Sequence, residues 1–135
     1  MSPSATGGQL PVLLLFRNDL RVADNGALWA ASQINKPVLA AYVRDEQSKG
    51  VRARGGASLW WLHHSLKALD TKLNALGIRL VLQRGATHSV VDDLIEKTGA
   101  DTVFWNRRYE PAWVAADTTM KSALRARDVR AESFD

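Results

Sequence analysis

Near its start the chain reads VLLLF at residues 12–16, and the polar segment RNDLR follows at residues 17–21. An unbroken run of apolar residues is typical of a strand that is buried on both faces, as in a parallel sheet covered by helices. The side-chain oxygens of Asp24 and Asn25 can cap a helix, and apolar residues then recur at helical spacing as far as Ile34. This part of the chain therefore predicts a buried strand, a polar loop and a short helix.

Strand and helix patterns alternate along the rest of the chain. Further strands are predicted at residues 38–43, 78–82, 102–105 and 129–134, the last of them at an edge. Further helices are predicted at residues 57–76 and 86–97 and from Pro111 onward. This alternation predicts an α/β fold, specifically a three-layer, doubly wound, Rossmann-like domain with a five-stranded, mostly parallel sheet.

Two of the predicted helices have an apolar face that we expect to pack on the sheet. The face of the long helix consists of leucines spaced by three or four residues: Leu59, Leu62, Leu66, Leu69, Leu73 and Leu76. In the last helix, the side chains expected to face the core are those of Trp113, Ala116, Met120 and Leu124. These faces would bury the sheet between two layers of helices.

The remaining tryptophans are assigned to packing rather than to electron transfer. Trp29 and Trp105 are expected to pack at the sheet. Trp60 and Trp61 are adjacent in a helix and point about 100° apart, so one is expected to pack and the other to face a cleft or a further domain.

The composition is that of one globular domain. The chain has 135 residues, 46% of them hydrophobic, and a net charge of +4 with the two signs interleaved. Residues 1–11 are rich in serine, glycine and proline and are expected to form a disordered leader, which leaves residues 12–135 for the domain. There is no cysteine, and the three histidines lack metal-ligand spacing, so no metal site is predicted.

No membrane segment is expected either. The apolar run at residues 12–16 is far shorter than the ~20 residues that a membrane span needs. A cytoplasmic location is therefore the default expectation.

Three loops lie where a doubly wound sheet binds its ligands, beyond the carboxyl ends of the strands. They are the loops at residues 17–21, 44–56 and 106–110. None contains a GxGxxG or GK[S/T] pattern, so a dinucleotide-binding or triphosphate-binding enzyme is disfavoured.

The same loops carry a resemblance to a known family. LFRNDLR at residues 15–21, with Asp24 and Asn25, resembles the opening of the photolyase/cryptochrome family. GGASLWWLHHSL at residues 55–66 is similar to the family's second helix, and FWNRRYEP at residues 104–111 is similar to its WNxxYEP segment. The three motifs follow the family's order and spacing, and the resemblance covers residues 12–135.

This resemblance implies the N-terminal α/β domain of a deoxyribodipyrimidine DNA photolyase or a cryptochrome. Such a domain binds a light-harvesting antenna chromophore, which is a reduced folate, a deazaflavin or a flavin, and passes excitation energy to a catalytic FAD. The FAD, the contacts to DNA and the carbon-carbon lyase chemistry belong to a helical C-terminal domain that is expected to be absent from residues 1–135.

Two further expectations follow for this domain taken alone. It is expected to contain no catalytic residue and to be inactive, and its uncovered apolar surface is expected to favour self-association. A second hypothesis stays open, in which the domain is a scaffold or interaction module that kept the fold and lost the ligand.

A set of positions in and near the three loops forms the candidate chromophore site: Arg17, Asn18, Asp19, Leu20, Arg21, Tyr42, Arg54, Ser58, Asn106, Arg108, Glu110 and Trp113. The charged residues at 17–21 could equally form a salt-bridged loop that clamps the first strand. Tyr42 matches an aromatic residue that flanks the ring in family members, or it packs at a strand end. Asn106 is expected to fix its loop by bonding backbone groups, with ligand contact second.

Glu110 has two interpretations. Its carboxylate could accept hydrogen bonds from the ring N–H groups of a pterin or deazaflavin, at a position that the resemblance links to deazaflavin contact. It could also simply interact with the dipole of the helix that starts at Pro111.

The resemblance also implies two departures from the family pattern. Trp113 falls where folate-binding relatives have a carboxylate, and Ser58 falls where deazaflavin-binding members have an arginine, a space that Arg52 or Arg54 could reach. The identity of the chromophore therefore stays open.

Overall fold

The computed structural model describes residues 10–17, 20, 22–44, 56–107 and 111–134. The strands in these residues are β1 (Val12–Phe16), β2 (Val38–Arg44), β3 (Arg79–Arg84), β4 (Thr102–Asn106) and β5 (Arg130–Phe134). The helices are α1 (Gly26–Gln33), α2 (Gly56–Ala75), α3 (Thr87–Thr98) and α4 (Pro111–Ala126). The predicted order of elements is confirmed.

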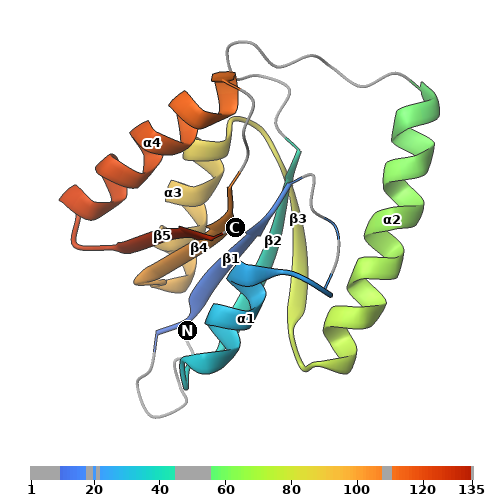
Figure 1. Cartoon of the computed structure of the whole chain (residues 1–135), viewed down its shortest axis with the longest axis horizontal. Helices are drawn as coiled ribbons and strands as arrows, with labels where there is room; N and C mark the ends of the chain where they lie inside the picture. Colours follow the sequence, from blue (N-terminus) through green and yellow to red (C-terminus); the bar gives the residue numbers. More distant parts are fainter. Residues whose placement is uncertain (1–9, 18–19, 21, 45–55, 108–110, 135) are drawn as a thin grey trace.

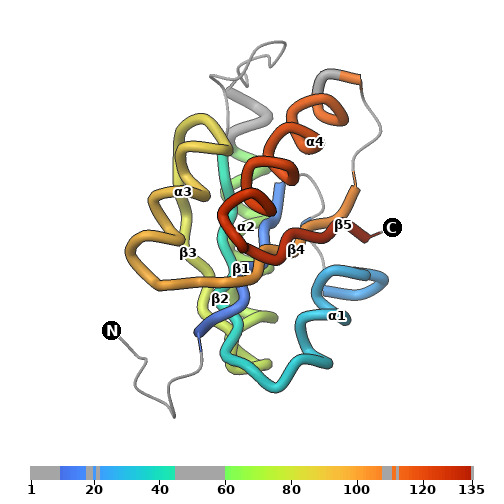
Figure 2. Tube along the Cα trace, turned by 90° about the vertical axis from the view of Figure 1, so that its left-hand side faces the viewer, coloured from blue at the N-terminus to red at the C-terminus, as the bar shows by residue number. Residues whose placement is uncertain are grey.

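The strands form one sheet in the order β3-β2-β1-β4-β5, and every pairing between neighbours is parallel. Helices α1 and α2 cover one face of the sheet, and α3 and α4 cover the other (Figure 1). Figure 2 shows α4 running beside β4 and β5. The predicted three-layer, doubly wound α/β fold is therefore confirmed, with a fully parallel sheet in the described residues.

Strand β1 lies at the centre of the sheet, and all of its residues are buried. Successive side chains of a strand point to opposite faces. Leu13 and Leu15 accordingly belong to the core under α3 and α4, whereas Leu14 and Phe16 belong to the core under α1 and α2. Burial on both faces explains why this segment contains no polar residue.

The leucine face of α2 is confirmed in its central part. Leu69 and Leu73 are buried and Leu66 is partly buried against the sheet. Leu76 is 58% exposed, so its predicted burial is wrong. It lies just after the last residue of α2, where the chain turns through Gly77 in the left-handed region and no longer follows the helical face.

The inward face of α4 differs from the prediction at one position. Met120 and Leu124 are buried as expected, and Trp113 is partly buried, but Ala116 is exposed. The residue that faces inward in that turn is Asp117, which forms an ion pair with the buried Arg17 directly after β1. Hydrophobic spacing alone does not show that an inward position is used by an ion pair.

The predicted packing of a tryptophan is confirmed for Trp105, which is buried, and wrong for Trp29 and for the one member of the Trp60–Trp61 pair that was expected to pack. Trp29 is 67% exposed, because α1 packs through Ala27, Leu28 and Ala31 and leaves Trp29 on its outer face. The indoles of both members of the Trp60–Trp61 pair are also exposed. The next residue, Leu62, is buried, and Trp61 and Trp60 lie about 100° and 200° away from it around the helix.

Candidate functional site

The candidate site is the crevice at the carboxyl ends of β1 and β4. These strands are neighbours, but the chain leaves β1 for α1 on one face and leaves β4 for α4 on the other (Figure 1). In a doubly wound sheet this reversal of strand order opens a crevice that binds ligands. Arg17 lies directly after β1 and Asn106 ends β4, so residues from the first and third motifs meet there.

Arg17 is held by a carboxylate from α4. Its Nη1 lies 2.5 Å from Oδ1 of Asp117 and its Nη2 lies 3.1 Å from Oδ2, which makes a two-point ion pair. Nη2 also donates to the backbone oxygen of Asn106 at 3.2 Å. The guanidinium is only 3% exposed, so these charge-assisted bonds replace its hydration. Arg17 therefore joins β1, β4 and α4.

Asn106 is held by the start of α1. Its Oδ1 accepts from the backbone N–H of Ala27 at 2.9 Å, and its Nδ2 donates to Oδ1 of Asn25 at 2.7 Å. The same Asn25 oxygen accepts from the N–H of Leu28 at 2.9 Å and caps α1. The expectation that Asn106 bonds backbone groups is confirmed, and the cap is Asn25 rather than Asp24.

Together these two sets of contacts form one switch-point network, made of Arg17, Asp117, Asn106 and Asn25. It links the carboxyl ends of two strands to a helix on each face of the sheet. A crevice floor that is already held by such bonds favours binding, because little conformational freedom is lost there when a ligand binds.

Three other candidate residues lie around this network. Tyr42 is buried at the end of β2, in register with Phe16, and packs in the core under α1 and α2. Leu20 is partly buried against the same core. Trp113 is partly buried in the first turn of α4. Tyr42 and the Arg17–Asp117 pair thus lie on opposite faces of the sheet.

The remaining candidates fall outside the described part of the chain: Asn18, Asp19, Arg21, Arg54, Arg108 and Glu110. Ser58 lies within α2, but its side chain is not among those described. Their contacts with a chromophore stay predictions.

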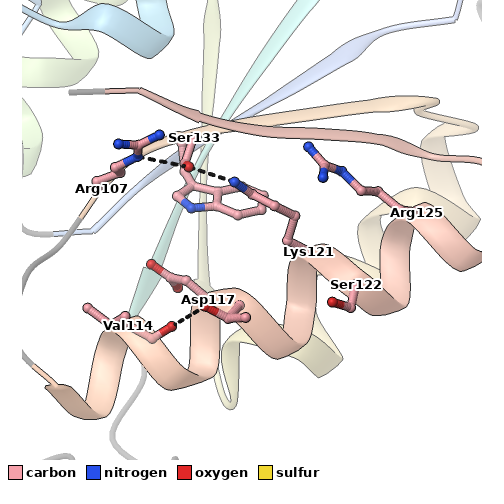
Figure 3. Close-up of a pocket in the computed structure, with 9 residues that line it drawn as sticks. Arg107, Val114, Asp117, Lys121, Ser122, Arg125 and Ser133 are labelled. Carbon is pink, nitrogen blue, oxygen red and sulfur yellow. Dashed lines mark hydrogen bonds between the residues drawn. The ribbon is translucent and has the colours of Figure 1, made fainter.

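A cavity of about 550 Å³ opens between α4 and the carboxyl ends of β4 and β5, and we call it the α4 cavity (Figure 3). Its lining includes Trp105, Arg107, Val114, Lys121, Arg125 and Ser133. Ser133 Oγ lies between two cations, 2.8 Å from Lys121 Nζ and 3.3 Å from Arg107 Nε. The hydroxyl thus accepts from both an ammonium and a guanidinium.

The electrostatics of Lys121 reflect this crowding of cations. Burial lowers the pKa of its ammonium, and the positive charges of Arg125 and Arg107 lower it further. The negative charges of Glu132 and Asp117 raise the pKa of Lys121, but the net shift is downward. The ammonium also lies 5.8 Å from the centre of the Trp105 ring, where a cation is attracted to the ring face.

The prediction from sequence missed the charged residues of α4. Asp117, Lys121 and Arg125 are spaced by four residues, which places them on one side of a helix. That spacing was a usable signal, but charged residues at helical spacing usually face solvent. Only the packing of α4 shows that this side faces the sheet edge.

Among the described residues, no group of three or more histidines or carboxylates is placed to hold a metal ion. None of the helices in the described ranges is long and apolar enough to cross a membrane.

Comparison with known proteins identifies the class of protein. The family described as DNA photolyase matches residues 12–135. The chain is 48% identical over 124 residues to the deoxyribodipyrimidine photo-lyase of Agrobacterium fabrum, covering 92% of this chain and 25% of that protein. It is 38% identical over 125 residues to cryptochrome-1 of Arabidopsis thaliana, covering 91% of this chain and 18% of that protein.

Solved structures agree with this result. The bacterial class III photolyase from Agrobacterium tumefaciens superposes with a TM-score of 0.84 at 47% identity, covering 93% of this chain and 26% of that one. The archaeal photolyase from Sulfolobus tokodaii has a TM-score of 0.77 at 23% identity, covering 93% of this chain and 29% of that one, and shares the fold.

The chain belongs to the DNA photolyase family. It corresponds to the N-terminal α/β region of photolyases and cryptochromes, as its three motifs predicted. It spans only 18% to 29% of the length of the four relatives described above.

Proposed function

We propose that this domain binds a light-absorbing antenna chromophore and passes excitation energy to an FAD held elsewhere in a photolyase-type protein. The observation that carries the proposal is the meeting of two family motifs at the switch point, where Arg17 and Asn106 are joined in one network. The family match over residues 12–135 supports the same function.

The proposed chromophore site lies above the switch-point network, between the loops at residues 17–21 and 106–110. In this proposal Arg17 and Asn106 hold the floor of the crevice, because their side chains already bond Asp117 and α1. Ring contacts come from the loop residues above, with Glu110 accepting hydrogen bonds from ring N–H groups, and from the first turns of α2 and α4. Tyr42 supports the crevice from the α1 and α2 face.

Three ring systems are proposed as the chromophore: a reduced folate, a deazaflavin or a flavin. The Sulfolobus tokodaii photolyase structure is described as having two FAD molecules, with the implication of a novel light-harvesting cofactor. That protein shares the fold with this chain, which supports including a flavin among the compounds to be tested.

The rest of the activity is proposed to lie outside residues 12–135. The Agrobacterium fabrum protein is a deoxyribodipyrimidine photo-lyase, of which this chain covers 25%. We propose that FAD binding, contact with DNA and the lyase reaction belong to the additional length, and that the protein is cytoplasmic. The relatives described above are photolyases or cryptochromes, which favours chromophore binding over the scaffold hypothesis.

The test is an absorption titration of the purified chain with a reduced folate, a deazaflavin and a flavin. One of the three should bind with one-to-one stoichiometry and give an absorption band in the near-ultraviolet or blue. Glu110→Gln should weaken that binding, whereas Glu96→Gln on the exposed side of α3 should leave it unchanged. A folded chain that binds none of the three compounds would refute the proposal and favour the scaffold hypothesis.

A further inference from the structure

The α4 cavity is a pocket of small-molecule size that adjoins the proposed chromophore site, since Asp117 lines the cavity and also holds Arg17. Its volume of about 550 Å³ falls within the range of roughly 300–1,000 Å³ that is typical of ligand pockets. It lies on the α3 and α4 face of the sheet, whereas Tyr42 packs on the opposite face. Its wall at Lys121, Arg125 and Ser133 holds none of the residues assigned to chromophore contact, so this part of the cavity requires an explanation of its own.

Three cationic side chains, from α4 and from the residue after β4, line this cavity (Figure 3). Arg107 follows β4, and Lys121 and Arg125 lie one turn apart on α4. Ser133 of β5 receives hydrogen bonds from Lys121 and Arg107. Arg125 is oriented by bonds from Nε and Nη2 to the backbone oxygen of Ala131, at 3.2 and 2.9 Å.

Two carboxylates in the described residues near the cavity are already paired. Asp117, which lines it, makes its two-point ion pair with Arg17. Glu132 of β5 forms an ion pair with Arg130. Among the described residues that line the cavity, positive charge exceeds negative charge, because Arg107, Lys121 and Arg125 are cations and the ion-paired Asp117 is a carboxylate.

The lowered pKa of Lys121 is consistent with this excess. Burial and the two neighbouring guanidinium groups disfavour its ammonium form. A bound anion would stabilise the ammonium, because an opposite charge within hydrogen-bond distance favours the charged state.

We propose that the α4 cavity binds a phosphorylated small molecule, with the phosphate held by Lys121, Arg107 and Ser133. Guanidinium and ammonium groups are the side chains that bind phosphate most strongly, and a serine hydroxyl can donate to a phosphate oxygen. The cavity is much larger than one phosphate group, and its wall also contains Val114 and Trp105. This apolar wall would contact the organic part of the ligand.

The recognition mode differs from that of nucleotide-binding loops. No glycine-rich phosphate-binding motif occurs in the sequence, and the donors proposed here are side chains on α4, on β5 and just after β4. Because these donors lie on or next to packed secondary-structure elements, the packing of the domain fixes their positions, and no flexible loop is needed to hold the anion.

The test measures binding by calorimetry and two-dimensional NMR, with inorganic phosphate, AMP and adenosine as probes. AMP should bind at least as tightly as inorganic phosphate, adenosine should not bind, and the shifted signals should include Ser133 and the Trp105 indole. Lys121→Met and Arg107→Gln should each weaken AMP binding by about tenfold or more. Lys72→Met, at an exposed position of α2, should leave it unchanged.

A second variant at position 121 keeps the proposal testable if the first one does not fold. Lys121→Arg keeps the charge and should keep most of the affinity, even if Lys121→Met proves unstable. Equal AMP affinity in Lys72→Met, Lys121→Met and Arg107→Gln would overturn the proposal, as would binding of adenosine or a failure of AMP to bind.

The two proposals fail separately. Binding of AMP with shifts confined to the α4 cavity, in a chain that takes up no chromophore, would support the phosphate site and refute the antenna function. Chromophore uptake by a chain that does not bind AMP would support the antenna function and refute the phosphate site.

Discussion

Removing the carboxylate of Asp117 should destabilise the domain more than any change to an exposed ion pair. Asp117→Ala leaves the guanidinium of Arg17 buried, with its bond to the backbone oxygen of Asn106 still in place. Breaking a buried ion pair costs about 3–5 kcal/mol, because a buried charge loses the opposite charge that it faced. Arg17 keeps this bond and its other interactions, which places the expected cost near the lower limit, at about 3 kcal/mol.

Urea unfolding followed by circular dichroism can measure this loss. With a slope of roughly 2 kcal/mol per molar urea, a cost of about 3 kcal/mol lowers the unfolding midpoint by about 1.5 M. The matched control is Asp92→Ala, which removes the partner of Arg127 at 2.6 Å, in a pair whose side chains are 55% and 46% exposed. Exposed pairs contribute less than about 1 kcal/mol, so the midpoint should fall by less than about 0.5 M.

A double variant separates the ion pair from simple loss of packing. Arg17→Met combined with Asp117→Leu removes both charges and fills the space with apolar groups, so it should be more stable than Asp117→Ala alone. If Asp117→Ala and Asp92→Ala shift the midpoint equally, the Arg17–Asp117 pair does not hold the crevice together and the reasoning fails.

Three further predictions concern the core, the chromophore site and the α4 cavity. Leu69→Ala should cost about 2–5 kcal/mol by opening a cavity under α2, whereas Leu76→Ala should change stability by less than about 0.5 kcal/mol in the same urea assay. Similar costs for the two would contradict the assigned helix face. Glu110→Gln should weaken chromophore binding by about ten- to a hundredfold in the absorption titration, and unchanged affinity would leave Glu110 as a helix-start residue. In an NMR titration, the Lys121 ammonium should lose its proton below the ordinary lysine value of 10.5, since burial and nearby arginines disfavour the charge. A midpoint at or above that value would contradict the description of the cavity.

Local patterns were enough to predict the elements and their order. A strand buried on both faces must be apolar throughout, so β1 could be assigned from residues 12–16 alone. The cap at Asn25 and the helix end at Gly99 depend on short-range bonds and backbone conformation, which neighbouring residues specify. The three family motifs also lie in the sequence itself, and they indicated the photolyase family without any knowledge of the contacts.

Contacts between distant segments could not be predicted in this way. Nothing near Arg17 in the sequence indicates that its partner is Asp117, because the two meet only when α4 packs over the ends of β1 and β4. The exposure of Trp29 likewise depends on which side of α1 packs on the sheet. The α4 cavity has the same origin, since Arg107, Lys121 and Ser133 come together through the parallel pairing of β4 with β5 and the packing of α4 beside them. Sequence patterns determined the elements and the family of this protein, whereas tertiary packing decided which charges became buried and paired. Burial and ion pairing depend on distances between segments, and local sequence does not specify those distances.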